Sequence, residues 1–121
     1  MFNETVMDHF QNPRNAGELA DADAVGSVGD PTCGDVTKVY LKVVDGKVAD
    51  IRYKTFGCAA AIASSSIATE MVKNKTLEEA ASITSEDIVD ALHGLPPEKI
   101  HCSRLAANAI RAAVEKYRAD S

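Results

Sequence analysis

Residues 36–56 read VTKVYLKVVDGKVADIRYKTF, and their alternation of apolar and polar side chains predicts two β-strands. The apolar side chains that share one predicted face are Val39, Leu41 and Val43 in the first strand and Ile51 and Tyr53 in the second. Asp45-Gly46 between the strands is typical of a type I′ hairpin turn. The stretch therefore predicts an antiparallel pair with one buried face and one solvated face, Tyr40 lying on the solvated one. A short strand at residues 25–28 would make the sheet three-stranded.

Helical patterns occupy most of the remaining chain. Three longer helices are predicted: from an Asn3 cap to about Phe10, from Ala59 to Lys73, and from about Cys102 to Arg118. Thr76 and Thr84 each open a short helix, and Gly94 ends the second of these. Two apolar stripes are expected: Ala59, Ala63, Ile67 and Met71 on the second helix, and Ala106, Ile110, Val114 and Tyr117 on the last. The serines at 64–66 are interpreted as small residues that allow close packing, and residues 95–99 as a stiff extended linker. These elements predict an α+β fold, a small antiparallel three-stranded sheet with helices packed on one face, in a single domain spanning residues 1–121.

Composition and charge exclude several classes of protein. The 121 residues are 45% hydrophobic and 26% charged, which is ordinary for a globular protein. The net charge of −5 and the lack of a Lys/Arg cluster argue against nucleic-acid binding. No apolar run is long enough to span a membrane, and residues 1–4 (MFNE) lack the basic character of a targeting segment. We therefore expect a cytoplasmic protein.

The three cysteines lie at predicted element junctions. Cys33 and Asp35 precede the first strand of the hairpin, Cys58 ends the second strand and opens a helix, and His101-Cys102 opens the last helix. Helix N-termini stabilise thiolates, so two of the thiols have a physical reason to be reactive or ligating. Buried free cysteines also behave as small hydrophobes, and the spacing matches no zinc-finger or ferredoxin pattern. The residues alone leave a metal site and structural thiols both open.

The histidines are predicted to differ in role. His9 and His93 are interpreted as packing or helix-terminal residues rather than ligands. Adjacent helical residues point roughly 100° apart, so a Cys–His dyad from His101 and Cys102 is not expected. Both side chains could nevertheless reach a site lying across the start of the helix.

Several motifs together resemble those of a known family. They are VMDHF (6–10) with NPRN (12–15), CGDV (33–36), TFGC (55–58), AIASSS (61–66), LPP (95–97) and KIHCS (99–103). In this order and without large gaps, they are similar to the U-type iron–sulfur cluster assembly scaffold family, the IscU type that also forms the N-terminal domain of NifU. The presence of His101 and the lack of a long insertion before Cys102 are typical of scaffolds rather than of the zinc-binding sulfur-acceptor relatives.

The resemblance implies a function and a site. The chain would hold iron and sulfur at Cys33, Asp35, Cys58, His101 and Cys102, with Cys102 accepting persulfide sulfur from a cysteine desulfurase. A [2Fe-2S] cluster would be built there with electrons from a donor such as a ferredoxin, and then passed to apo-proteins. The chain would thus be a scaffold and carrier, not an enzyme in the strict sense.

The sequence is also compatible with two other functions. One is a zinc-bound sulfur acceptor that works with a cysteine desulfurase, since Zn²⁺ accepts the same N, O and S ligands in a cluster-free form. Another is a plain interaction domain with buried structural thiols. Open too are whether Asp35 or His101 is the fourth ligand, whether a [4Fe-4S] form occurs, and whether a homodimer shares the cluster. Glu98 stands where the family's chaperone-recognition motif usually has Val, which predicts weak binding to a specialised chaperone.

Overall fold

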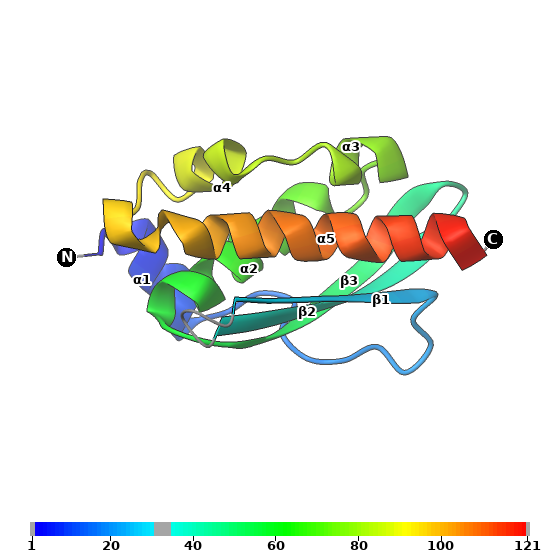
Figure 1. Cartoon of the computed structure of the whole chain (residues 1–121), viewed down its shortest axis with the longest axis horizontal. Helices are drawn as coiled ribbons and strands as arrows, with labels where there is room; N and C mark the ends of the chain where they lie inside the picture. The colour runs from blue at the N-terminus through cyan, green and yellow to red at the C-terminus, as the bar shows by residue number, and fades with distance from the viewer. Residues whose placement is uncertain (1, 31–34, 121) are drawn as a thin grey trace.

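The computed structural model describes residues 2–30 and 35–120. One helix precedes three consecutive strands, and the remaining helices follow the sheet (Figure 1). In chain order the elements are α1 (Glu4–Gln11), β1 (Ala24–Asp30), β2 (Asp35–Val44), β3 (Lys47–Phe56), α2 (Ala59–Val72), α3 (Leu77–Ala81), α4 (Ser85–Ala91), the 3₁₀ turn η1 (Pro97–Lys99) and α5 (Ile100–Asp120). None of the helices in this described part of the chain combines the length and apolar character needed to cross a bilayer.

The sheet is the predicted antiparallel meander, with strand order β1-β2-β3. The turn between β2 and β3 has positive φ at both Asp45 (54°) and Gly46 (74°), as a type I′ turn requires. The predicted inward side chains Val39, Leu41, Ile51 and Tyr53 are at most 3% exposed. Tyr40, predicted on the solvated face, is only 7% exposed. The reason is that β2 is the central strand, so the ring is flanked on both sides, and the Lys38 amine lies 5.6 Å from its centroid.

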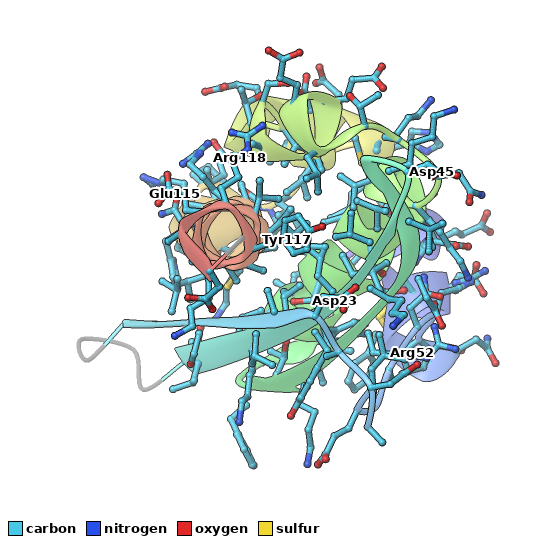
Figure 2. All side chains as sticks on the ribbon, turned by 90° about the vertical axis from the view of Figure 1, so that its right-hand side faces the viewer. Asp23, Asp45, Arg52, Glu115, Tyr117 and Arg118 are labelled. Carbon is cyan, nitrogen blue, oxygen red and sulfur yellow. The ribbon has the colours of Figure 1, made fainter. Side chains whose placement is uncertain are left out.

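Helices cover one face of the sheet. Helix α5 lies along β1 and β2, α2 packs on β3, and α3 and α4 pack against α5. Figure 2 shows α5 end-on above the sheet, while side chains on the opposite sheet face project outward. Gly26 permits the close approach of α5 to β1: a Cβ there would lie 2.8 Å from the Ala109 carbonyl oxygen and 2.9 Å from the Ala112 carbonyl carbon. The predicted α+β architecture is confirmed.

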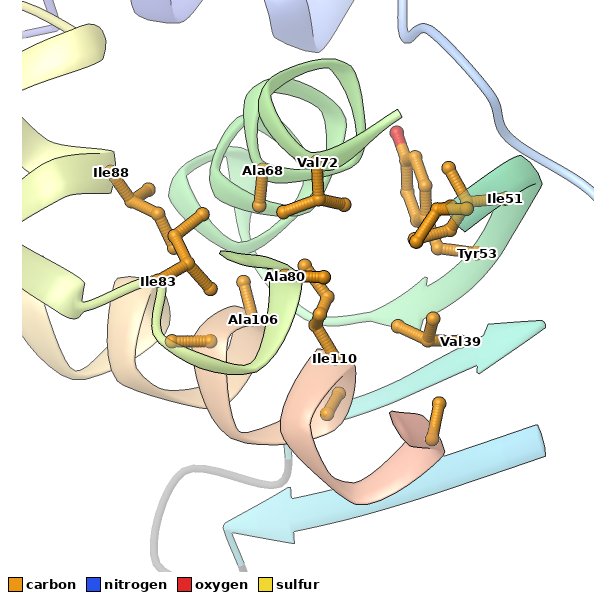
Figure 3. Close-up of a cluster of buried hydrophobic side chains, with 14 of the residues drawn as sticks. Val39, Ile51, Tyr53, Ala68, Val72, Ala80, Ile83, Ile88, Ala106 and Ile110 are labelled. Atoms are coloured by element: carbon orange, nitrogen blue, oxygen red, sulfur yellow. The ribbon is translucent and has the colours of Figure 1, made fainter. Parts of the chain in front are cut away.

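The main core lies between the sheet and these helices (Figure 3). Figure 3 shows Val39, Ile51 and Tyr53 of the sheet facing side chains from α2, α5 and the α3–α4 region. The predicted stripe on α5 is confirmed for Ala106, Ile110 and Val114, which are at most 1% exposed.

The stripe predicted on α2 is confirmed in part, because Ala63 is fully buried and Ile67 and Met71 pack against the main core. Ala59, Ile67 and Met71 are only partly buried, whereas Ser64, Ser65 and Ser66 are at most 2% exposed. The helix is covered by α1 as well as by the sheet and α5, so more than one of its faces is buried. Small side chains allow these close approaches, which confirms the predicted packing role of the serines.

Local signals fix the helix ends. The Asn3 side chain accepts a hydrogen bond from the Val6 amide, and Thr76 and Thr84 each form the predicted capping box. The extended linker predicted at 95–99 is wrong, because Pro97–Lys99 forms a 3₁₀ turn closed by the bond from the Lys99 amide to the Pro96 carbonyl (2.8 Å). Proline at the first helical position favours that turn. It leads directly into α5, which begins at Ile100, two residues before the predicted start.

Candidate metal centre

Three element starts converge at one end of the molecule. Asp35 begins β2, Cys58 is the N-cap of α2, and Cys102 lies in the first turn of α5. One potential ligand atom from each residue lies within 4.8 Å of the others, and this is the only such group among the described residues. Cys33, the third cysteine expected to be a ligand, lies outside the described residues. Positions at element ends let these side chains meet without interrupting the core.

The distances within the group are short. The Cys102 Sγ lies 3.8 Å from the Cys58 Sγ and 3.7 Å from the Asp35 Oδ2. The His101 Nε2 lies 3.6 Å from the same Asp35 oxygen and 3.6 Å from the Cys102 Sγ. Four of the five residues singled out by sequence are therefore brought together.

The contact between His101 and Cys102 corrects one expectation. Adjacent helical positions were predicted not to face each other, yet the two side-chain tips meet. Both side chains reach across the helix start toward Asp35, and this common target brings them together. The accompanying expectation, that both could reach a site lying there, is confirmed.

Gly57 makes room for the Asp35 carboxylate. A Cβ at position 57 would lie 2.7 Å from the Asp35 Oδ1, 3.0 Å from its Cγ and 3.0 Å from the Ala61 Cβ. Real Cβ atoms essentially never approach another atom to less than 3.0 Å, so a side chain here would displace the carboxylate. This role of Gly57 was not predicted from the sequence. The signal available was a glycine directly before Cys58, at the junction of a strand and a helix.

Hydrogen bonds between hydroxyl groups connect β2, β3 and α2 next to the candidate site. The Thr55 Oγ1 lies 2.9 Å from the Ser65 Oγ and donates to the Thr37 Oγ1 at 3.4 Å, and the Ser65 Oγ donates to the Ala61 carbonyl at 3.0 Å. These bonds join β2, β3 and α2 immediately beyond Asp35 and Cys58. The relative positions of the two strands and the helix are thereby set close to the candidate ligands.

Burial dominates the electrostatics of Cys102. Its side chain is 1% exposed, and burial, followed by the neighbouring Cys58 and then Asp35, raises the pKa of the thiol far above its usual range. This shift is opposite in direction to the one expected from the start of α5. A cation bound among these groups would reverse the balance, because it favours the deprotonated sulfur.

The other two histidines lie elsewhere. His9 is buried, with its Nδ1 2.8 Å from the Ser66 Oγ, and the His93 Nδ1 lies 3.0 Å from the Thr5 Oγ1. Neither belongs to the metal-ligand group found in the described part of the chain. Both observations agree with the packing and terminal roles predicted for them.

Together these features define a small α+β domain whose element starts gather two thiols, a carboxylate and an imidazole into one candidate metal centre. The chain matches the family model described as "NifU-like N terminal domain" over residues 1–121, and it belongs to that family.

Named relatives cover nearly the whole chain. It is 57% identical over 117 residues to "Iron-sulfur cluster assembly scaffold protein IscU 1" of Archaeoglobus fulgidus, covering 97% of this chain and 76% of that protein. It is 51% identical over 121 residues to the Escherichia coli protein "Iron-sulfur cluster assembly scaffold protein IscU", covering 97% and 94%. A solved NifU-like N-terminal structure from Brucella abortus superimposes with a TM-score of 0.80 over 98% of this chain and 95% of that one; at 24% identity it shows the fold alone.

Proposed function

We propose that this protein is a scaffold on which a [2Fe-2S] cluster is assembled from iron and sulfur and then transferred to apo-proteins. The observation that carries the proposal is the convergence of Asp35, Cys58 and Cys102 within 4.8 Å, together with His101. The names of the relatives support it. Thiols packed only as small hydrophobes would have no reason to adjoin a carboxylate and an imidazole.

The proposed ligands are the thiolates of Cys33, Cys58 and Cys102, completed by Asp35 or His101. Thiolates are soft donors that suit cluster iron, whereas a carboxylate oxygen is harder and is displaced more easily. A shell with one exchangeable donor suits a cluster that must leave. A dedicated electron-transfer protein would instead be expected to have four thiolates.

Cys102 is the proposed sulfur acceptor. Its thiolate attacks the outer sulfur of a persulfide on a cysteine desulfurase, a new S–S bond forms on Cys102, and the donor cysteine leaves as a thiolate. Two electrons from a donor such as a ferredoxin then cleave that bond, which releases sulfide and regenerates the Cys102 thiolate. The His101 Nε2 and the Asp35 Oδ2, 3.6 and 3.7 Å from the Cys102 sulfur, are the groups placed to take the thiol proton.

In this scheme the chain is a carrier that acts with a desulfurase, and the chemistry of sulfur release belongs to that partner. Its working place is the cytoplasm. The zinc-bound sulfur-acceptor alternative is not favoured, because the curated relatives named above are scaffolds.

The test is anaerobic reconstitution with ferrous iron, cysteine and a desulfurase, followed by visible absorption and Mössbauer spectroscopy. Wild type should gain the absorption of a cluster and the Mössbauer spectrum of a [2Fe-2S] centre. Cys33→Ser, Cys58→Ser and Cys102→Ser should each lose most of it while keeping native circular dichroism, because the main core lies elsewhere. Ser27→Ala, on an exposed position of β1, is the matched control and should behave as wild type.

Mass spectrometry after incubation with desulfurase and cysteine should place the added sulfur on Cys102. Persulfide found on Cys33 but not on Cys102 would overturn the assignment of the acceptor. Wild type that takes up Zn²⁺ but gains no cluster absorption would overturn the scaffold proposal itself.

A further inference from the structure

The proposed function places conflicting demands on Cys102. Its sulfur has to meet a persulfide on another protein, yet the residue is only 1% exposed. Some neighbouring group therefore has to move before the sulfur can be reached. Polar groups of Cys58, Asp35 and His101 lie within 3.8 Å of the sulfur, and apolar side chains pack against the cluster to which Cys102 belongs. The need for access to this sulfur rests on the proposed function, whereas the contacts around it do not.

Cys102 belongs to a small apolar cluster separate from the main core. Its other fully buried members are Ala60 and Ala61 of α2. Phe2, Leu95 and Cys58 pack against this cluster, and Phe2 and Leu95 also pack against the main core. The two alanines lie in the first turn of α2, so their positions are tied to the start of that helix. Phe2 precedes α1, and Leu95 lies in the connection between α4 and η1, so these two can be displaced without unwinding a helix.

One side chain links the segments that carry Phe2 and Leu95. The Asn3 Nδ2 donates to the carbonyl oxygens of Leu92, His93 and Gly94 at 3.0, 3.1 and 3.2 Å. Phe2 is the residue before Asn3, and Leu95 is the residue after the last of these carbonyls. This set of contacts is called the Asn3 clamp here.

The backbone and a second bond reinforce the Asn3 clamp. After α4 the backbone takes left-handed conformations at His93 (φ 63°) and Gly94 (φ 109°), two of the residues whose carbonyls Asn3 binds. The Thr5 Oγ1 also lies 3.0 Å from the His93 Nδ1. The beginning of α1 and the end of α4 are thereby joined across 88 or more residues of sequence.

We infer that Asn3 is a positioning residue that governs access to the Cys102 sulfur. While its amide holds the three carbonyls, Phe2 and Leu95 stay packed on the thiol cluster and Cys102 is closed to other proteins. When these bonds break, Phe2 and Leu95 separate, and the sulfur becomes reachable without unfolding of the sheet.

A single substitution separates this role from helix capping. The Asn3 Oδ1 accepts from the Val6 amide at 2.9 Å, which is the cap of α1. Asn3→Asp keeps an oxygen for that bond, and aspartate is as good a cap as asparagine, but it has no N–H to give the carbonyls. The helix start should survive while the Asn3 clamp is lost.

The experiment measures the rate at which N-ethylmaleimide labels Cys102 in the full metal-free chain, with Cys33 and Cys58 replaced by Ser in all samples. Asn3→Asp should raise the rate about tenfold or more, since a tenfold change in an opening equilibrium corresponds to ~1.4 kcal/mol, the size expected when such hydrogen bonds are lost. The matched control is Asn12→Ala, which removes an exposed bond to Asp8 at the other end of α1 and should leave the rate unchanged. Hydrogen exchange of β2 amides, followed in the same samples, reports global unfolding and should change far less than the labelling.

An unchanged labelling rate in Asn3→Asp would overturn the inference. So would an equal increase in Asn12→Ala, or acceleration of β2 exchange by the same factor as the labelling. The labelling measurement needs neither iron nor desulfurase, so its outcome does not depend on cluster assembly. Failure of the Asn3 clamp can therefore be distinguished from failure of the scaffold proposal.

Discussion

Gly57→Ala should push the Asp35 carboxylate out of the candidate metal centre. The backbone of Gly57 lies outside the left-handed region, so alanine is tolerated conformationally and any effect comes from the added methyl group. That methyl carbon would start 2.7 Å from the Asp35 Oδ1, and the oxygen must move by about 0.7 Å to restore an ordinary contact of 3.4 Å. Binding sites tolerate displacements of only about 0.5 Å, so the ligand geometry should suffer.

The substitution should change both the unfolding free energy and the metal affinity. Overpacking of this kind costs about 1–3 kcal/mol of unfolding free energy. A displaced ligand should weaken metal binding by about 10–100-fold, the range found when groups that orient a ligand are lost. The first is measured by urea unfolding of the metal-free protein, and the second by anaerobic Co²⁺ titration followed through the thiolate-to-cobalt absorption. The matched control is Gly29→Ala, whose Cβ would meet the Val36 Cγ2 at 3.3 Å and the Asp35 backbone oxygen at 3.6 Å.

A double-mutant cycle makes the reasoning refutable. In an Asp35→Ala background the clash with the carboxylate is gone and only the 3.0 Å approach to Ala61 remains. Gly57→Ala should then cost less by about 0.5 kcal/mol or more, the usual size of coupling between residues in contact. An equal cost in both backgrounds would show that Gly57 does not position Asp35.

Four further outcomes are expected. Asp35→Ala should still assemble a cluster but release it more slowly to an apo-ferredoxin, because the easily displaced oxygen donor is gone; equal or faster transfer from equally loaded protein would contradict this. Burial lowers the pKa of His9 below its ordinary 6.5, so on acidification the unfolded chain binds a proton before the folded chain does. The free energy of unfolding should therefore fall as the pH drops below about 6.5, by at most ~1.4 kcal/mol per pH unit. His9→Gln, which can retain a bond to Ser66, should flatten that dependence in urea titrations at pH 7.5 and 5.5. Gly26→Ala should destabilise by several kcal/mol, since its methyl group meets helix backbone rather than a movable side chain, and an unchanged melting temperature would disprove the close approach. A peptide covering residues 95–99 should bind an Hsp70-type chaperone more weakly than the same peptide with Glu98→Val, because a carboxylate is costly to desolvate in an apolar groove; equal affinities would refute this.

The sequence by itself determined the local features of this protein. Alternation and Asp45-Gly46 predicted β2, β3 and their turn, because period-two patterns and positive φ act over a few residues. The capping boxes at Thr76 and Thr84 were found for the same reason. Local signals also placed Cys58 and Cys102 at element starts, although only the family resemblance combined them with Asp35 and His101 into one site.

Tertiary structure decided what depends on contacts between distant residues. Periodicity indicates an apolar face but not how many neighbours a helix has, so the sequence predicted close packing at Ser64 to Ser66 without indicating that α1, as well as the sheet and α5, covers α2. The meeting of Asp35 with Cys102 spans 67 residues, and no local pattern fixes a distance over that separation. Packing also bears on the chemistry: the start of α5 predicts a stabilised thiolate, whereas burial, followed by the neighbouring Cys58 and Asp35, raises the pKa of the Cys102 thiol.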